Sequence, residues 1–411
     1  MIVSIYDYGM NGEGVAKLNG KVVLVPKAMV GETVDIFVTN DYKNYAEARV
    51  VEIITPSPER VAKNCNISGC GGCGLTHMTY TEQLKFKQLL IKKTIKKIAR
   101  IDCEVNPTVA CQKQLNYRNK ASFVVGDAVG FYKENSHQIV NIDNCNLMDE
   151  NINKTLKIFK NWLNFNENCI KNLVVRSLNN QILVGVVVEK ETDLSTFYTA
   201  LQQLNLPVGL YEIINTRKDS VVLAGTVKHI AGIKEINLTN FGVNYSIDIM
   251  SFHQTNEEIQ NKIYTKVLDY ITPEDVVVNA FSGAGLLTAI ASKKAKKVYG
   301  VEIVQSAHLL AEQLKQANQL NNITNLHMDF NKFLLNSPKS DILLIDPPKK
   351  GCGKILEKTD TKSIIYISCS PISLAKDLQI LTKNYIIEEI TPYDMFPNTI
   401  SVETVVKLRR K

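Results

Sequence analysis

A cysteine and a glutamate near the end of the chain have the surroundings that covalent catalysis requires. Cys369 lies in the hexapeptide YISCSP, between two serines, the second of which precedes Pro371. A structural thiol is normally buried in apolar packing, whereas a turn between a strand and a helix exposes its cysteine, so we expect Cys369 to be a nucleophile. Glu403 lies in the valine-rich segment SVETVV, where burial would raise its proton affinity into the range of a general base. Alternation alone also allows Glu403 to be an outward-facing strand residue.

Glycines and acidic residues mark a candidate cofactor site in the last third of the chain. The segment FSGAG at 281–285 follows an apolar run and precedes a helical pattern, so its backbone can approach a ligand at a helix N-terminus. Glu302, Asp329 and Asp346 each follow a later strand pattern. Because Thr288 replaces the third glycine of a dinucleotide fingerprint, the pattern favours an adenosine-type cofactor other than NAD, and S-adenosylmethionine fits best. A turn aspartate before two prolines is the alternative interpretation of Asp346.

Three cysteines have the spacing of metal ligands. Cys65, Cys70 and Cys73 lie in the glycine-rich segment CNISGCGGCG, far from any pair of histidines. Three thiolates on one tight loop need a fourth ligand from elsewhere, and the spacing is compatible with zinc or with an iron–sulfur cluster. The chain has nine cysteines in total. Four more lack partner spacing and are expected to be spare thiols: Cys103, Cys111, Cys169 and Cys352.

The elements that carry these residues divide the chain into three predicted domains. Residues 1–60 contain short β-branched runs separated by glycines, which is typical of a small OB-like barrel. Residues 61–249 contain a lysine-rich helical stretch, with Leu84 and Ile91 on its apolar face and its lysines expected on the solvated remainder, and then a β-rich region. Residues 250–411 alternate strand and helix patterns, which predicts a Rossmann-like α/β domain with a parallel sheet, closed by two antiparallel strands.

Composition describes an ordinary globular protein. The chain has 411 residues, of which 45% are hydrophobic and 22% charged, and its net charge of +7 favours a polyanionic partner. We find no signal peptide and no apolar run long enough to span a bilayer, so we expect a cytoplasmic protein whose cysteines stay reduced.

A cysteine nucleophile, a carboxylate base and a methyl donor together solve one particular chemical problem. The C5 carbon of uracil is a poor nucleophile, but addition of a thiolate at C6 creates an enolate that can attack a sulfonium methyl group. A base must then remove the C5 proton, so that the thiolate leaves by elimination.

At this point the chain resembles the S-adenosylmethionine-dependent RNA uracil-C5 methyltransferases, over nearly its whole length. The segment GMNGEGVAKLNGKVVLVPKAMVGETV resembles the family's TRAM domain, and YRNKASFVVG and VGFYKENSHQIVNIDNC resemble its central domain. The segments SFHQTN, DPPKKG, YISCSP and DMFPNTISVETV resemble its catalytic motifs.

The resemblance assigns roles to individual residues. It implies that Cys369 is the nucleophile and Glu403 the proton acceptor. It implies that five residues line the pocket for the cofactor and uracil: Gln254, Phe281, Glu302, Asp329 and Asp346. It also supplies Cys145, from NIDNC, as the fourth ligand beside Cys65, Cys70 and Cys73, and implies a [4Fe–4S] cluster with a structural or RNA-positioning role.

The expected substrate is a uridine of structured RNA, and 23S rRNA is favoured because family members that act on tRNA generally lack the TRAM domain and the cluster cysteines. The base would be flipped out of its stack to reach Cys369. We expect a monomer with no obligate protein partner. A tRNA uridine-C5 methyltransferase, an RNA cytosine-C5 methyltransferase and a non-catalytic RNA-binding relative remain open as alternatives.

Four positions depart from the family pattern. The family usually has an acidic residue at the position of Asn279, a cysteine at Ser282, an asparagine at Ser370 and a histidine at Ser401. Neither proposed catalytic residue is affected, so the departures concern cofactor affinity and rate more than the type of reaction.

Overall fold

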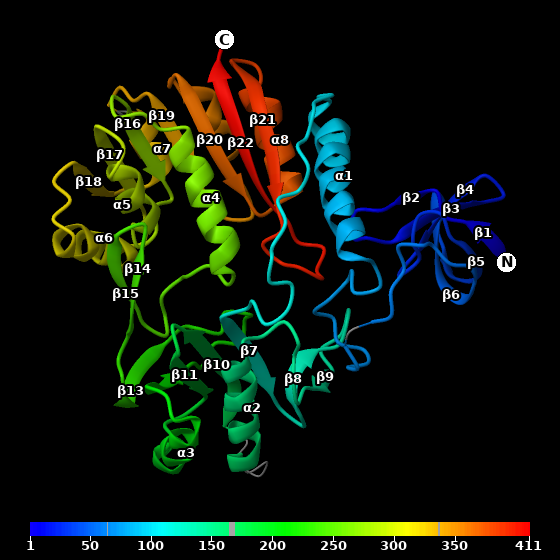
Figure 1. The fold of residues 1–411 in the computed structure, drawn as a ribbon, viewed down its shortest axis with the longest axis horizontal. Coiled ribbons are helices and arrows are strands. Elements are labelled where there is room, and N and C mark those ends of the chain that lie inside the picture. Colours follow the sequence, from blue (N-terminus) through cyan, green and yellow to red (C-terminus); the bar gives the residue numbers. More distant parts are fainter. Residues whose placement is uncertain (64, 164–168, 336–337) are drawn as a thin grey trace.

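The computed structural model describes residues 1–63, 65–163, 169–335 and 338–411. Figure 1 shows the N-terminal strands on one side, a β-rich region below and an α/β domain above, with helix α1 (Tyr80–Ala99) standing beside the α/β domain. No helix in the described part of the chain is long and apolar enough to cross a membrane.

The N-terminal region forms a six-stranded sheet in the order β1-β5-β6-β4-β3-β2. Its strands alternate buried and exposed positions, and the buried side chains, such as Val23, Val34 and Ile36, form their own core. The strand bounds are β1 (Ile2–Ser4), β2 (Asp7–Tyr8), β3 (Gly14–Leu18), β4 (Lys21–Val25), β5 (Thr33–Asp41) and β6 (Tyr45–Thr55).

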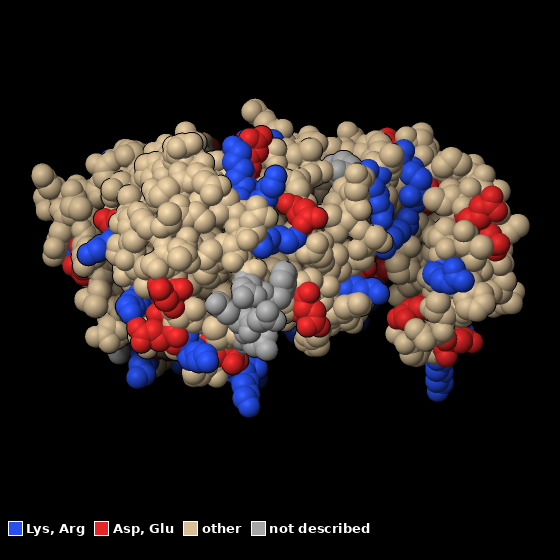
Figure 2. All heavy atoms as spheres, turned by 90° about the horizontal axis from the view of Figure 1, so that it is seen from below, with Lys and Arg blue, Asp and Glu red and all other residues tan. Residues whose placement is uncertain are grey.

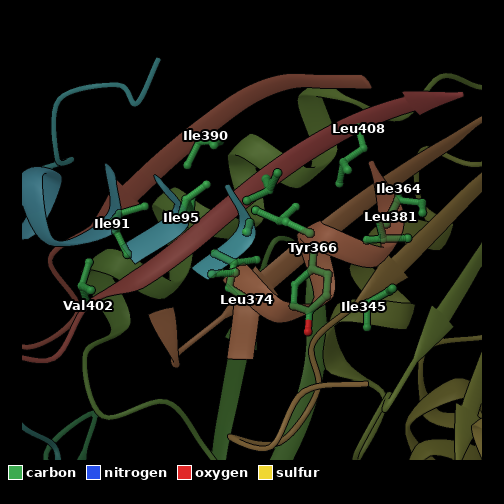
Figure 3. Close-up of a cluster of buried hydrophobic side chains, with 14 of the residues drawn as sticks. Ile91, Ile95, Ile345, Ile364, Tyr366, Leu374, Leu381, Ile390, Val402 and Leu408 are labelled. Carbon is green, nitrogen blue, oxygen red and sulfur yellow. The ribbon is translucent and has the colours of Figure 1, made fainter. Parts of the chain in front are cut away.

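Helix α1 begins at a cap, where the Thr79 hydroxyl accepts a hydrogen bond from Glu82 N at 3.3 Å, and it ends at Arg100 in the left-handed region. Its apolar face packs against the α/β domain. Figure 3 shows Ile91 and Ile95 among buried side chains of that domain, including Leu374 and Ile390. The helix therefore belongs structurally to the last domain, although it precedes the central region in sequence.

One expectation for this helix was wrong. Its lysines were expected to cover the solvent side, but Lys87 is fully buried. Its Nζ forms an ion pair with Asp394, which is also buried, and donates to the carbonyl of Phe396 at 3.0 Å. The compensating carboxylate lies far away in the sequence, so no local pattern indicated it.

The central region is built on a mixed seven-stranded sheet in the order β13-β12-β11-β10-β7-β8-β9. Helices α2 (Glu150–Trp162) and α3 (Ser195–Leu201) cover one face of this sheet, and a separate hairpin, β14 (Ile236–Asn240) and β15 (Val243–Ile247), leads into the α/β domain. The strand bounds are β7 (Lys120–Val125), β8 (Val129–Tyr132), β9 (Ile139–Asn141), β10 (Ile170–Leu178), β11 (Gln181–Val188), β12 (Val208–Ile214) and β13 (Thr226–Gly232).

The α/β domain has a seven-stranded sheet in the order β18-β17-β16-β19-β20-β22-β21. Its first five strands in that order are parallel, whereas β22 runs antiparallel to both β20 and β21. This confirms the predicted parallel sheet and its closing antiparallel pair. The strand bounds are β16 (Val276–Ala280), β17 (Lys297–Glu302), β18 (Ile323–His327), β19 (Ile342–Ile345), β20 (Ser363–Ser368), β21 (Tyr385–Tyr393) and β22 (Glu403–Arg410).

The helices of this domain alternate with its strands. They are α4 (Glu257–Asp269), α5 (Leu286–Ser292), α6 (Gln305–Ala317), α7 (Phe330–Leu335), the short 3-10 helix η2 (Gly353–Lys358) and α8 (Pro371–Leu381). Because the strands are parallel, their carboxyl ends share one edge, and the predicted site residues that follow β16, β17, β18, β19 and β20 are brought to that edge.

Candidate active site

Cys369 is the first of the two residues, Cys369 and Ser370, that connect the end of β20 to the start of α8. Ser370 caps this helix, since its Oγ accepts from Ser373 N at 3.4 Å, and Pro371 occupies the first turn, where a missing N–H is tolerated. The bend leaves the Cys369 side chain half-buried, at the carboxyl edge of the sheet. Asparagine and serine are equally good caps, so the departure at Ser370 preserves the geometry of this helix start.

Glu403 begins the antiparallel strand next to Cys369 and is 6% exposed. Burial, and then the charge of Asp346, raise the pKa of Glu403 to about 8, and Lys349 opposes the shift. Burial also raises the pKa of the Cys369 thiol, as do the carboxylates of Glu403 and Asp346, and Lys349 again acts in the opposite direction. The structure thus brings three acidic groups and one lysine together, although Glu403 and Cys369 are 34 positions apart in the sequence.

Asp346 follows β19 in the segment DPPKKG, and burial raises its pKa to about 7. Two carboxyl groups with raised pKa values and a thiol in one apolar surrounding are typical of sites that transfer protons near neutral pH. Since a positive charge stabilises the ionised form of every one of them, Lys349 or a cationic ligand would favour a thiolate and a carboxylate here.

A buried aspartate that the sequence interpretation missed fixes the loop that follows Asp346. Asp377, on α8, accepts hydrogen bonds through Oδ2 from Cys352 N at 2.7 Å and from the Tyr366 hydroxyl at 2.6 Å. Its Oδ1 accepts from Gly353 N at 2.9 Å. One carboxylate therefore joins α8, β20 and the end of the 346–353 loop. Cys352, expected to be a spare thiol, contributes its backbone to this network.

The FSGAG segment turns sharply at the end of β16. Phe281 has φ of +59°, which is rare for a non-glycine residue, and Gly283 and Gly285 have φ of +54° and +85°. Glu302, at the end of β17, accepts a hydrogen bond from Gly283 N at 2.9 Å. A methyl group added at Gly283 would meet no atom within 4 Å, so this backbone borders open space at the start of α5. That is the expected cradle for a ligand at a helix N-terminus.

Asp329 lies after β18, where its Oδ1 caps α7 by accepting from Asn331 N at 2.9 Å. Gln254 lies in the loop between β15 and α4, and its carbonyl oxygen accepts from the amide of Asn119 at 3.0 Å, which attaches this loop to the central sheet. Asp329 lies at the same edge as Phe281 and Glu302, since it follows β18, the neighbour of β17, whereas Gln254 follows the separate hairpin β14-β15.

The remaining departures from the family pattern are accommodated locally. The buried amide of Asn279 donates to the Thr288 hydroxyl at 2.8 Å, while its Oδ1 has no partner. Ser282 donates its backbone N–H to Val301 at 3.1 Å, so its main-chain contact does not depend on a cysteine side chain. Ser401 is exposed, whereas the side chain of the neighbouring Val402 packs in the hydrophobic core.

Four thiols gather at the junction between the loop 65–73 and the segment NIDNC. Burial raises the pKa of Cys73 to about 12, and the charges of Cys145, Cys70 and Cys65 act in the same direction, so all three lie within range of its charge. All nine cysteines are free. Within the described residues, no group of three or more His, Cys, Asp or Glu side chains has an arrangement that could hold a metal ion. The four cysteines are the residue type that holds an iron–sulfur cluster, but the described residues do not bring them into the predicted ligand arrangement.

The fold and the site define a class I S-adenosylmethionine-dependent methyltransferase with an N-terminal TRAM domain. The TRAM family matches residues 2–51, and the tRNA (Uracil-5-)-methyltransferase family matches residues 79–411. The chain therefore belongs to the family of RNA uracil-C5 methyltransferases.

Individual proteins agree with this assignment. An uncharacterized RNA methyltransferase of Clostridium tetani is 33% identical, over 98% of this chain and 94% of that protein. A second one, from Caldanaerobacter subterraneus, is 32% identical over 99% and 97%. A crystal structure of Pyrococcus abyssi tRNA (uracil-54, C5)-methyltransferase in complex with S-adenosyl-L-homocysteine shares the fold, with a TM-score of 0.79 at 24% identity, covering 99% of this chain and 100% of that one.

Proposed function

We propose that this enzyme methylates C5 of a uridine in RNA, with Cys369 as the nucleophile and Glu403 as the proton acceptor. The convergence of Cys369, Glu403, Asp346 and Lys349 at the carboxyl edge of the sheet is the observation that supports this assignment most strongly. We also propose that the chain has three domains, residues 1–60, 61–249 and 250–411, which all contribute to RNA binding. We place the enzyme in the cytoplasm.

In the proposed reaction the Cys369 sulfur bonds to C6 of uracil, and the electron pair of the C5–C6 double bond moves onto C5 and O4. S-adenosylmethionine, when bound, supplies the methyl group that C5 takes. Glu403 then removes the remaining C5 proton, the double bond forms again and the thiolate leaves. Lys349 lies where it lowers the pKa of both groups, which favours the ionised forms that the two steps need.

We assign the cofactor pocket to the five residues at the open edge of the sheet: Gln254, Phe281, Glu302, Asp329 and Asp346. The open space over Gly283, and the Glu302 carboxylate at the end of the second parallel strand, support this assignment because both are typical of adenosine sites.

The mechanism is tested by following the covalent step directly. Purified wild-type protein, incubated with methyl-labelled cofactor and RNA, should place the label on C5 of uridine, as identified by nucleoside mass spectrometry. Cys369→Ala should abolish transfer, and Cys103→Ala should retain it as a thiol control. Glu403→Gln should accumulate a protein–RNA adduct that survives denaturing electrophoresis, because the C5 proton can no longer leave. Full activity of Cys369→Ala would refute the mechanism, and label on cytosine would show that the enzyme methylates cytosine instead of uracil.

For the RNA class we favour 23S rRNA, because the chain carries both the TRAM domain and the four gathered cysteines. A tRNA is the second candidate, favoured by the name of the family that matches residues 79–411 and by the full-length structural match to a tRNA enzyme. Parallel assays with large-subunit rRNA and tRNA from a strain that lacks the enzyme should separate them. If RNA binds and the cofactor does not, the non-catalytic alternative replaces the proposal.

We propose that Cys65, Cys70, Cys73 and Cys145 hold a [4Fe–4S] cluster. It would tie the loop 65–73 to the central sheet near Cys145, with no part in methyl transfer. Support comes from the proximity of four thiols that repel one another when ionised and that a cationic iron core would neutralise. Anaerobic purification should give about four irons per chain by this assignment, and Cys145→Ser should lose iron while keeping cofactor affinity.

The face seen in Figure 2 has no single broad basic patch for RNA phosphates, because basic and acidic side chains are intermixed on it. A hollow of about 910 Å³ beside α2, lined by Lys154, Lys157 and several asparagines, lies in this central region. Local groups of cations, rather than the net charge of +7, are therefore expected to position the substrate.

A further inference from the structure

Two basic side chains face each other at one end of the central sheet. Lys120, at the start of β7, and Arg176, on β10, are direct partners across the antiparallel pair. Directly opposed residues project from the same face of a sheet, and like charges in that position destabilise it. Such a pair therefore needs a compensating anion.

The described residues supply no adequate anion. Arg176 has 0% exposure, and its guanidinium donates through Nη2 to the carbonyl of Ser251 at 2.5 Å, while Nε and Nη1 have no partner. Asp248 is near enough for its charge to be felt by Arg176, but its Oδ1 already accepts from Met250 N and from Ser251 N. Two unpartnered donors of a buried guanidinium are costly unless a ligand binds them.

Lys120 likewise lacks a compensating negative charge among the described residues. Burial, and then the charge of Arg176, lower the pKa of Lys120 to about 8, and no carboxylate opposes them. His253, which packs nearby, cannot help, because burial and Arg176 lower its pKa to about 4 and keep it neutral. Lys120 is only partly buried, so it forms the side from which a ligand can reach the pair.

The pair lies directly beneath the loop that carries Gln254. Asn119, the residue before Lys120, holds that loop by its amide, and Figure 1 shows the ends of β7 and β10 below α4, which the loop enters. The same loop presents Phe252, which is 82% exposed. An exposed aromatic ring beside two cations is typical of a surface that contacts nucleotides.

We propose that Lys120 and Arg176 form an anion subsite that takes one phosphate of the RNA backbone, next to the nucleotide that enters the active site. This inference rests on the proposed action on RNA. The partly buried ammonium of Lys120 supplies the contact that a phosphate can reach, and the buried guanidinium of Arg176 adds its positive charge behind it. A phosphate is favoured over the carboxylate of the cofactor because none of the three acidic residues assigned to the cofactor pocket, Glu302, Asp329 and Asp346, is among the charges that shift Lys120 or Arg176.

The test measures RNA affinity against salt concentration, in the presence of S-adenosylhomocysteine and without any methyl transfer. Fluorescence anisotropy with a labelled tRNA transcript and a labelled 23S rRNA fragment compares the wild type with Lys120→Met, Lys120→Arg and the exposed control Lys190→Met. For Lys120→Met we expect affinity to fall about tenfold and the slope of log K against log salt to fall by about one, as for one lost phosphate contact. Lys120→Arg and Lys190→Met should retain the wild-type slope.

A second arm locates the contact. RNA oligonucleotides with an uncharged methylphosphonate at one linkage at a time should reveal a linkage where the wild type loses affinity and Lys120→Met does not. Equal losses at every linkage, an equal loss in Lys190→Met, or an unchanged slope would overturn the subsite.

Calorimetry with S-adenosylhomocysteine alone tests whether the pair binds the carboxylate of the cofactor instead. Weaker cofactor binding by Lys120→Met would show that it does and would refute the proposal. Thermal unfolding of Lys120→Met and Lys120→Arg checks that both are folded. Because RNA binding is measured without turnover, these experiments test the phosphate subsite even if the enzyme does not methylate uridine.

Discussion

Replacing Asp377 by asparagine should destabilise the protein and slow its reaction through one buried network. The aspartate accepts from three donors, two on Oδ2 and one on Oδ1. An asparagine keeps one oxygen, so in its better orientation it still accepts from Cys352 N and the Tyr366 hydroxyl but sets an NH₂ group against Gly353 N–H. A lost hydrogen bond to a charged group is worth roughly 1.5–3 kcal/mol, and the two remaining bonds lose their charge, so we expect a loss of about 3 kcal/mol.

The effect on activity follows from what the network holds. Asp377 fixes the end of the loop that carries Asp346 and Lys349, and a small displacement of reacting groups slows catalysis by about 10- to 100-fold. Urea unfolding and single-turnover methyl transfer measure the two effects. Tyr366→Phe removes one of the three bonds to the carboxylate and should lose roughly 1.5–3 kcal/mol.

The matched control for this prediction is Glu357→Gln. It removes an exposed ion pair with Lys383, 2.9 Å long, between η2 and the turn that follows α8, with side chains 50% and 63% exposed. This control should leave stability and rate unchanged. An Asp377→Asn protein as stable and as active as the wild type would refute the assigned role of the network.

Three further predictions concern the site and its supports. Because the pKa of Glu403 is raised to about 8, the free enzyme holds it protonated at neutral pH, so kcat/KM of the wild type should rise with pH up to about 8, and a profile that is flat across neutral pH would contradict its role as the base. Lys87→Met leaves Asp394 buried without its cation and should lower the unfolding free energy by about 3–5 kcal/mol, most of which the double variant Lys87→Met/Asp394→Leu should restore in urea unfolding. Gly285→Ala places a methyl group 2.8 Å from a side-chain carbon of α6 and should destabilise the fold, whereas Gly283→Ala adds a methyl into open space and should mainly weaken binding of S-adenosylhomocysteine in calorimetry.

Short-range patterns were enough to predict much of the α/β domain. The turn at Cys369 was predicted because a strand pattern, two serines and a proline follow one another within a few residues. The sheet edge was predicted for a similar reason, since parallel strands with crossover helices bring their carboxyl ends to one side. The place of α1 was not predictable, because its apolar face fits any complementary surface and only the folded chain selects α8.

By itself the sequence determined the strand and helix pattern, the motifs and the residue types that suit a thiol-dependent methyl transfer. The tertiary structure alone decided which distant side chains meet: Lys87 with Asp394, Lys120 with Arg176, and Glu403 with Cys369. The physical reason is that local preferences act within a few residues, whereas the burial that shifts a pKa or leaves a charge unpaired depends on every element packed around the group. From the sequence alone, lysines and arginines are therefore expected on the surface, and only the packed structure shows which of them are buried.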